Sequence, residues 1–193
     1  MFVAEKGIEL DEQFIDIYKG EHFSAEFKKK SPLWDVPVLE LDDGTCISQI
    51  NAICRFLEDM HPEPALYGQT PEERAEVSMW NHIGFINGMQ AIAEVARNSM
   101  EAFENRAVLG TRNYAQIPAL AERGVQRMIQ FMEEMDTRLS NSQYIGGAAF
   151  SVADITAFVA IDLGITNGIA MPEGLSHLEN WHANINARPS AKA

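Results

Sequence analysis

The sequence has little cysteine and no long apolar run, and each shortage excludes a class of protein. Its two cysteines, Cys46 and Cys54, lie outside the C-x-x-C spacing of redox and zinc motifs. We expect both to be small apolar groups in a reducing compartment. No apolar stretch approaches the roughly 18 residues of a membrane span, and no signal segment is recognisable. The sequence therefore predicts a cytoplasmic protein that does not associate with membranes.

Basic residues are also scarce, with 15 Lys and Arg against 28 Asp and Glu in 193 residues, a formal charge of −13. Such a surface repels phosphate backbones, so no nucleic-acid partner is expected. The five histidines have no ligand spacing, which predicts that no metal is bound. The G-x-S-x-G motif of hydrolases and the phosphate-binding glycine motifs are missing as well. What remains is a globular chain, 46% hydrophobic, of one or two domains.

The most informative stretch is VPVLELDDGTCISQINAICRFL, residues 36–57. The turn Asp42-Asp43-Gly44 separates two short apolar runs, which is typical of a β-hairpin. Apolar residues then recur at Ile50, Ile53, Cys54 and Leu57, the spacing of one helix face. Pro37 has no N–H, so it should stand at the very start of its strand and leave the backbone of Val36 to pair with something else. A ligand backbone is one candidate.

Before this stretch, residues 1–6 predict a short helix that ends at Gly7, and residues 8–18 predict a strand. After it, the proline-bearing residues 61–68 predict a linker. The rest predicts helices. One starts at the capping box Thr70–Glu73 and runs to near Phe103, with Gly84 and Gly88 where a close neighbour or a ligand approaches.

Further helices are predicted to start at Pro118 and at the capping box Ser151–Asp154, and a last one ends before Arg188. The second of these is apolar almost all round, which predicts a buried central helix. The cap explains Ser151 and Asp154 without any catalytic role. Methionines at 128, 132 and 135 follow a helical seam and predict core packing.

In this order the segments VPVLELDDG, AICRFLE, HPEPALYG, TPEERAEV and YIGGAAFSVADITAF resemble the cytosolic glutathione S-transferases, especially bacterial ones, over nearly the whole chain. The resemblance implies a thioredoxin-like α/β domain at residues 1–67 and an all-helical bundle domain at residues 71–193. It also implies that the first strand and most of the first helix, about 15–20 residues by ordinary element lengths, precede Met1. The alternative is a shortened protein with a rebuilt sheet.

The resemblance further implies that glutathione, as co-substrate, binds at Trp34, Val36, Pro37, Gln49 and Ile50. Val36, ahead of a proline that is typically cis in the family, offers the backbone edge for the cysteinyl part. The helix that begins near Ile50 offers its N-terminus to the γ-glutamyl carboxylate. Gln49 can pair with the γ-glutamyl group through its amide, whereas Ile50 has only its backbone N–H where the family usually has a serine.

By the same resemblance the protein is a homodimeric detoxification enzyme that conjugates the glutathione thiolate to small, largely apolar electrophiles. Its thiol-activating residue is expected upstream of Met1, so we name no catalytic residue. Phe85 and Met89 are predicted to line the electrophile pocket. Two alternatives stay open: a non-catalytic binding or scaffold protein, which Ile50 and Asp35 favour, and a glutathione-dependent isomerase, dehalogenase or peroxidase.

Overall fold

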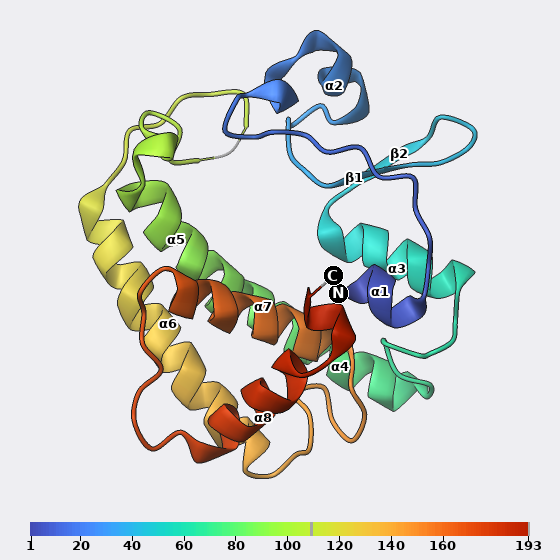
Figure 1. Ribbon diagram of the computed structural model, residues 1–193, viewed down its shortest axis with the longest axis vertical. Helices are drawn as coiled ribbons and strands as arrows, with labels where there is room; N and C mark the ends of the chain where they lie inside the picture. Colours follow the sequence, from blue (N-terminus) through green and yellow to red (C-terminus); the bar gives the residue numbers. More distant parts are fainter. Residues whose placement is uncertain (109, 193) are drawn as a thin grey trace.

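The computed structural model describes residues 1–108 and 110–192, and Figure 1 shows a small α/β part beside a helical part. The α/β part contains α1 (Phe2–Lys6), η1 (Glu21–Phe23), α2 (Ala25–Lys30), β1 (Val38–Glu40), β2 (Cys46–Ser48) and α3 (Ile50–Met60). The helical part contains α4 (Pro71–Ile83), η2 (Gly84–Met89), α5 (Gln90–Ser99), η3 (Glu101–Phe103), α6 (Pro118–Leu139), α7 (Val152–Thr166), α8 (Ser176–Asn186) and η4 (Pro189–Lys192). None of the described helices is both long enough and apolar enough to cross a bilayer.

The predicted hairpin and the helix after it are confirmed. Strands β1 and β2 pair antiparallel, with Val38 opposite Ser48 and Glu40 opposite Cys46. Gly44 closes the turn with a φ of 86°, a conformation that glycine adopts at little cost. α3 follows β2 after a single residue, Gln49. The tight succession fixes the direction of the α3 N-terminus relative to the start of β1.

The strand predicted at residues 8–18 is wrong. Residues 8–16 are irregular, and the sheet formed by the described residues has two strands. A strand needs a neighbour for its backbone groups, and none of the described strands lies beside this segment. The segment ends in a turn of its own, in which Glu21 N–H donates to Asp16 O at 3.1 Å. The apolar side chain of Phe14 is 85% exposed, so the apolar pattern there marks no buried face.

The long helix predicted from Thr70 forms, with two differences. A π-helical segment, Gly84–Met89, interrupts it, and its α-helical course ends at Ser99 rather than near Phe103. The close approach predicted at Gly88 comes from the protein itself. A Cβ there would lie 2.6 Å from Phe131 and 2.9 Å from Ala160, so glycine lets α6 and α7 pack against this segment.

The core of the helical part is formed by buried residues of α5, α6, α7 and α8. The methionine seam is confirmed, since Met128, Met132 and Met135 are fully buried. α7 is buried along most of its length, as its apolar sequence predicts. Its capping box also forms, and Asp154 accepts further hydrogen bonds from Ile145 N–H at 2.8 Å and Trp181 Nε1 at 3.0 Å. One buried carboxylate therefore joins α7, the turn before it and α8.

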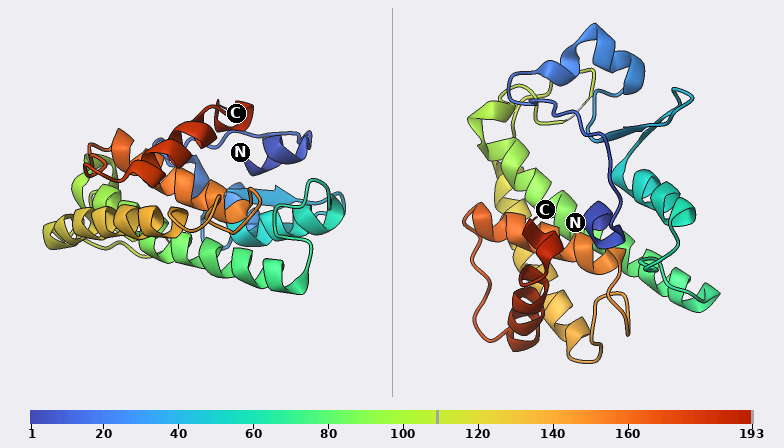
Figure 2. Two further views of the ribbon diagram at one scale, coloured as in Figure 1. Left: turned by 90° about the horizontal axis from the view of Figure 1, so that it is seen from below. Right: turned by 45° about the vertical axis from the view of Figure 1, so that its right-hand side comes forward.

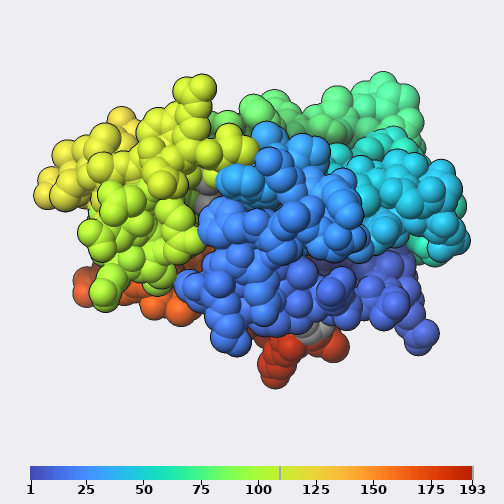
Figure 3. Space-filling model, turned by 90° about the horizontal axis from the view of Figure 1, so that it is seen from above, coloured from blue at the N-terminus to red at the C-terminus, as the bar shows by residue number. Residues whose placement is uncertain are grey.

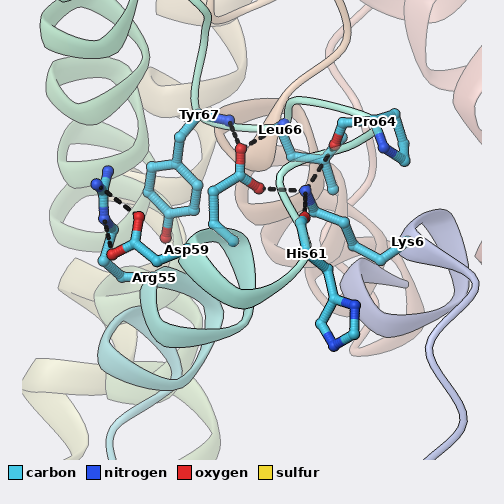
Figure 4. A network of polar contacts seen from close by, with 8 residues as sticks. Lys6, Arg55, Asp59, His61, Pro64, Leu66 and Tyr67 are labelled. Carbon is cyan, nitrogen blue, oxygen red and sulfur yellow. Dashed lines mark hydrogen bonds and ion pairs between the residues drawn. The ribbon is translucent and has the colours of Figure 1, made fainter.

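A buried ion pair joins α1 to α3 and to the linker (Figure 4). Lys6 Nζ lies 2.5 Å from the Glu58 carboxylate and donates to His61 O at 2.7 Å and Pro64 O at 2.6 Å. The second carboxylate oxygen of Glu58 accepts from Leu66 N–H at 3.0 Å. The domain boundary that we predict between residues 67 and 71 lies just beyond this contact and stays a prediction.

Two further contacts hold the α/β part against the helical part. Asn81 of α4 donates to Asn51 Oδ1 of α3 at 3.0 Å and accepts from Thr156 of α7 at 2.6 Å. The ends of the chain also meet, as Figures 1 and 2 show, because Arg188 pairs with Glu5 at 2.7 Å. The α/β part is thus fixed relative to the bundle at α1 and at α3.

Candidate functional site

The residue between β2 and α3 has a strained backbone. Gln49 has a φ of 72° and a ψ of 118°, a region that residues other than glycine rarely adopt. It is the N-cap of α3 but makes no side-chain cap, so the first amides of this helix are not satisfied by their own cap residue. Ile50, at the first helical position, is 52% exposed. The junction therefore presents an accessible helix N-terminus.

The side chain of Gln49 is held by an acidic residue from the preceding loop. Its amide donates to the Asp35 carboxylate, whose other oxygen accepts from the hydroxyl of Ser31. Ser31 is fully buried, and its Oγ also accepts from Asp35 N–H at 3.0 Å. The sequence analysis counts Asp35 in favour of a non-catalytic protein, but in the structure it orients the residue predicted to meet the γ-glutamyl group.

Val36 lies next to this cluster and precedes a cis peptide bond to Pro37, as the resemblance implies. Val36 is 42% exposed, and the β1 ladder begins only at Val38. The backbone of Val36 thus stands outside the sheet pairing, which agrees with the edge predicted from Pro37.

A cavity of about 290 Å³ opens beside Val36. One wall comes from residues 17, 18, 22, 23 and 34–36, and the other from residues of 102–108 and 110–113, after α5. Figure 3 shows this face, where the blue N-terminal residues meet the yellow-green segment that precedes α6. The lining is mostly apolar. Its apolar members are Ile17, Phe23, Trp34, Val36, Ala102, Phe103 and Val108.

The structure brings some of the predicted site residues together and leaves others apart. Trp34 and Val36 line the cavity, and Gln49 reaches it through Asp35, which is also part of the lining. Phe85 and Met89 are not among the lining residues, and Met89 packs on the helical core instead. Their role in a substrate pocket stays a prediction. The described residues do not test the prediction of a thiol-activating residue ahead of Met1.

Sequence reasoning missed several polar residues of the cavity, among them His22, Arg106 and Arg112. His22 is 7% exposed, and its Nδ1 has no hydrogen-bond partner among the described residues. Burial lowers the pKa of His22, and the positive charge of Arg106 lowers it further, so the imidazole is neutral near pH 7. No local motif signals these residues, because only the fold brings residue 22 to residues 106 and 112.

Within residues 1–108 and 110–192, no three His, Cys, Asp or Glu side chains lie close enough together to hold a metal ion. What the site does offer is a helix N-terminus, an exposed backbone edge and an apolar cavity next to each other. These can take, respectively, a carboxylate, an extended peptide and a small apolar molecule.

Comparison with known families gives two matches. A model described as glutathione S-transferase, N-terminal domain, matches residues 1–60, and one described as glutathione S-transferase, C-terminal domain, matches residues 99–189. Glutathione S-transferase 2 of Saccharomyces cerevisiae is 30% identical over 195 residues, covering 98% of this chain and 80% of that protein. Protein LigF of a Sphingobium species is also 30% identical, over 227 residues, covering 97% of this chain and 84% of that protein.

Similar solved structures belong to the same family as these sequence matches. A glutathione S-transferase domain-containing protein of Marinobacter aquaeolei superposes with a TM-score of 0.87 at 33% identity, covering 98% of this chain and 91% of that one. Gtt2 of Saccharomyces cerevisiae gives a TM-score of 0.88 at 29% identity, covering 99% and 90%. These matches confirm the predicted fold class, a thioredoxin-like α/β domain followed by an all-helical bundle domain.

Proposed function

Because this chain belongs to the glutathione S-transferase family, we propose that it binds glutathione and conjugates its thiolate to small, largely apolar electrophiles. In that reaction the sulfur forms a bond to an electrophilic carbon, and the leaving group departs with the electron pair of the bond that breaks. The thiol proton passes to solvent. The protein contributes binding, proximity and stabilisation of the thiolate.

The strained backbone of Gln49 at an uncapped helix N-terminus carries this proposal. Strain of this kind costs about 1–3 kcal/mol and persists where a function needs the geometry. Here it exposes the first amides of α3 for the γ-glutamyl carboxylate, and Asp35 orients the side chain of Gln49 so that its second amide proton and its carbonyl oxygen bind the γ-glutamyl group. The cysteinyl backbone then lies along Val36, which directs the sulfur toward the cavity.

The cavity beside Val36 is the proposed place for the electrophile. Its mostly apolar lining suits an apolar molecule, and its position next to Val36 brings that molecule close to the sulfur. We further propose a cytoplasmic homodimer with a role in detoxification.

Two alternatives have support of their own. Asp35 already occupies the amide of Gln49 and adds a negative charge beside an anionic tripeptide, which favours a non-catalytic binding or scaffold protein. Relatives also include a solved structure titled beta-etherase LigF and a rat maleylacetoacetate isomerase, 28% identical over 79% of this chain. These names support a glutathione-dependent reaction other than conjugation, such as isomerisation. Dehalogenation and peroxide reduction use the same glutathione site and stay open as alternatives.

Isothermal titration with glutathione, and with S-methylglutathione as a thiol-free analogue, tests the binding. We expect both to bind and Gln49→Gly to weaken each about tenfold or more, since a bond to a charged group contributes about 1.5–3 kcal/mol. The free energy of unfolding of Gln49→Gly should be about 1 kcal/mol higher than that of the wild-type protein, because glycine relieves the strained backbone. Gln49→Ala is the matched control, which should lose affinity without gaining stability.

Conjugation is measured separately as thioether formation from glutathione and 1-chloro-2,4-dinitrobenzene. If the folded protein binds neither peptide, the transferase proposal is wrong. If it binds both but forms no thioether with any electrophile of a broad panel, the scaffold alternative is favoured.

A further inference from the structure

The cavity beside Val36 has a charge pattern that its apolar lining does not explain. A volume of about 290 Å³ lies at the lower end of ligand pockets, roughly 300–1,000 Å³. The space therefore suits a single aromatic ring, flanked by Phe23 and Trp34 on one wall and Phe103 on the other. In so small a pocket, the polar groups of the lining strongly influence which aromatic ligand binds.

Two arginines line this pocket. Arg106 donates to Ala102 O at 2.9 Å and lies 5.4 Å from the ring of Phe23, which holds the guanidinium at the wall. Among the described residues, no carboxylate lies within ion-pair distance of Arg106 or Arg112. In a chain with a formal charge of −13, two arginines without an acidic partner at one small cavity are unexpected.

Asp35 is the one acidic residue among the described residues that line the cavity. Both of its carboxylate oxygens already accept hydrogen bonds, from Ser31 and from Gln49. Asp35 is thus engaged on the side of the cavity toward α3, and it does not pair with either arginine. The lining as a whole is cationic.

Two further polar atoms of the lining residues are unsatisfied. Nε1 of Trp34 and Nδ1 of His22 are buried and have no partner among the described residues. An indole N–H can only donate, so the group that satisfies Trp34 must be an acceptor. Buried groups without a partner are rare in proteins and call for an explanation. An acceptor atom on a bound ligand would explain the unsatisfied Trp34 N–H, and an anionic acceptor would also suit the two arginines.

We infer that the cavity takes an electrophile whose aromatic ring carries an anionic group, such as a carboxylate, held by Arg106 and Arg112. The inference rests on the proposed function and narrows its substrates from apolar electrophiles in general to acidic aromatic ones. Guanidinium groups bind carboxylates through paired, charge-assisted hydrogen bonds, and these are stronger inside a partly enclosed pocket than in water.

Equilibrium binding of 3-nitrobenzoate and 3-nitrobenzamide, measured with and without saturating S-methylglutathione, tests the inference without any reaction. The two molecules differ mainly in charge. We expect the benzoate to bind more tightly, and Arg106→Met and Arg112→Met each to weaken it about tenfold, the effect of losing one charge-assisted bond. The amide should change less than about twofold by the same reasoning.

Arg74→Met is the matched control, because it removes the same charge from a partly exposed side chain outside the cavity lining and should leave both affinities unchanged. If Arg106→Met fails to fold, Arg112→Met still serves, since Arg112 is exposed and its removal leaves no cavity in the core. Equal binding of benzoate and amide by the wild-type protein would overturn the inference.

A kinetic comparison separates this inference from the proposed function. 4-Chloro-3,5-dinitrobenzoate and its amide both lose chloride, with its electron pair, when the glutathione sulfur bonds to the ring. We expect the ratio of their kcat/KM values to fall about tenfold in Arg106→Met, with the KM for glutathione unchanged. A higher KM for glutathione with both substrates would instead assign the arginines to the tripeptide and overturn the inference.

The two failures have different signatures. If both chlorides are conjugated and the ratio of their kcat/KM values does not change in the arginine variants, the transferase function is supported and the preference for an acidic substrate is wrong. If binding of 3-nitrobenzoate depends on the arginines but neither chloride is conjugated, the anion site is supported and the transferase function is wrong.

Discussion

At the scale of single residues, burial lowers the pKa of two histidines, His22 and His182. His182 of α8 stacks on Phe158 with ring centroids 4.9 Å apart, and its Nε2 is buried 3.8 Å from Asp162. Burial lowers the pKa of His182 below the ordinary 6.5, and the opposing effect of the Asp162 charge is smaller. His22 is shifted in the same direction.

These shifts predict a loss of stability on mild acidification. The folded pKa lies below that of the unfolded chain, so the unfolded state binds more protons as the pH falls through 6.5 toward the folded value. The free energy of unfolding should therefore be lower at pH 5.5 than at pH 7.5 in urea titrations. His182→Gln should show a smaller difference between the two pH values, while His82→Gln, at an exposed position, should keep the wild-type difference.

At the scale of elements, local sequence patterns predicted correctly those elements whose backbone hydrogen bonds are made within the element or its caps. Both predicted capping boxes form. Thr70 Oγ1 accepts from Glu73 N–H at 3.2 Å, and the Glu73 carboxylate accepts from Thr70 N–H at 3.2 Å. The strand at residues 8–18 failed because a strand depends on a neighbour that its own sequence does not encode. α1 is the intermediate case, since five residues are too few for a stable helix without tertiary contacts.

The Lys6–Glu58 pair is one of the contacts that hold α1, and Lys6→Met should strongly destabilise the fold. The Lys6 side chain is fully buried, and its removal leaves the Glu58 charge without a cation, which costs about 3–5 kcal/mol. Lys29→Met is the matched control, because the Lys29–Glu26 pair is exposed and contributes at most about 1 kcal/mol. Urea unfolding of both variants decides the question, and equal midpoints would show that the buried pair is unimportant.

At the scale of the whole molecule, the outer surface of the long helix carries apolar groups that the monomer does not cover. Met79 and Ile86, seven residues apart and therefore near one face, are 51% and 41% exposed. Exposed apolar groups on one helix face are a common feature of subunit interfaces. We place the proposed homodimer contact on this face.

Light scattering coupled to size-exclusion chromatography should then give a mass of twice 21.5 kDa for the wild-type protein. The double variant Met79→Glu, Ile86→Lys should elute as a monomer, because two charges would be buried at the contact. Met60→Glu, also at an exposed apolar residue but on α3, is the control expected to remain a dimer. A wild-type monomer would contradict the proposal, as would a double variant that stays dimeric.

The sequence by itself determined the hairpin and α3, the linker, both capping boxes and the buried character of α7, because each follows from periodicity or from contacts within a few residues. It also located Val36, Pro37 and Gln49 at the junction where the structure shows an exposed edge and a strained turn.

Only the tertiary structure decided the rest, since it joins residues that are distant in the sequence. It showed that residues 8–16 stay irregular and that Gly88 serves helix packing. It also showed that Asp35 holds Gln49 and that His22 shares a cavity with Arg106. The spacing of 84 residues between these last two side chains has no local signature, because long-range contacts depend on how whole elements pack rather than on periodicity.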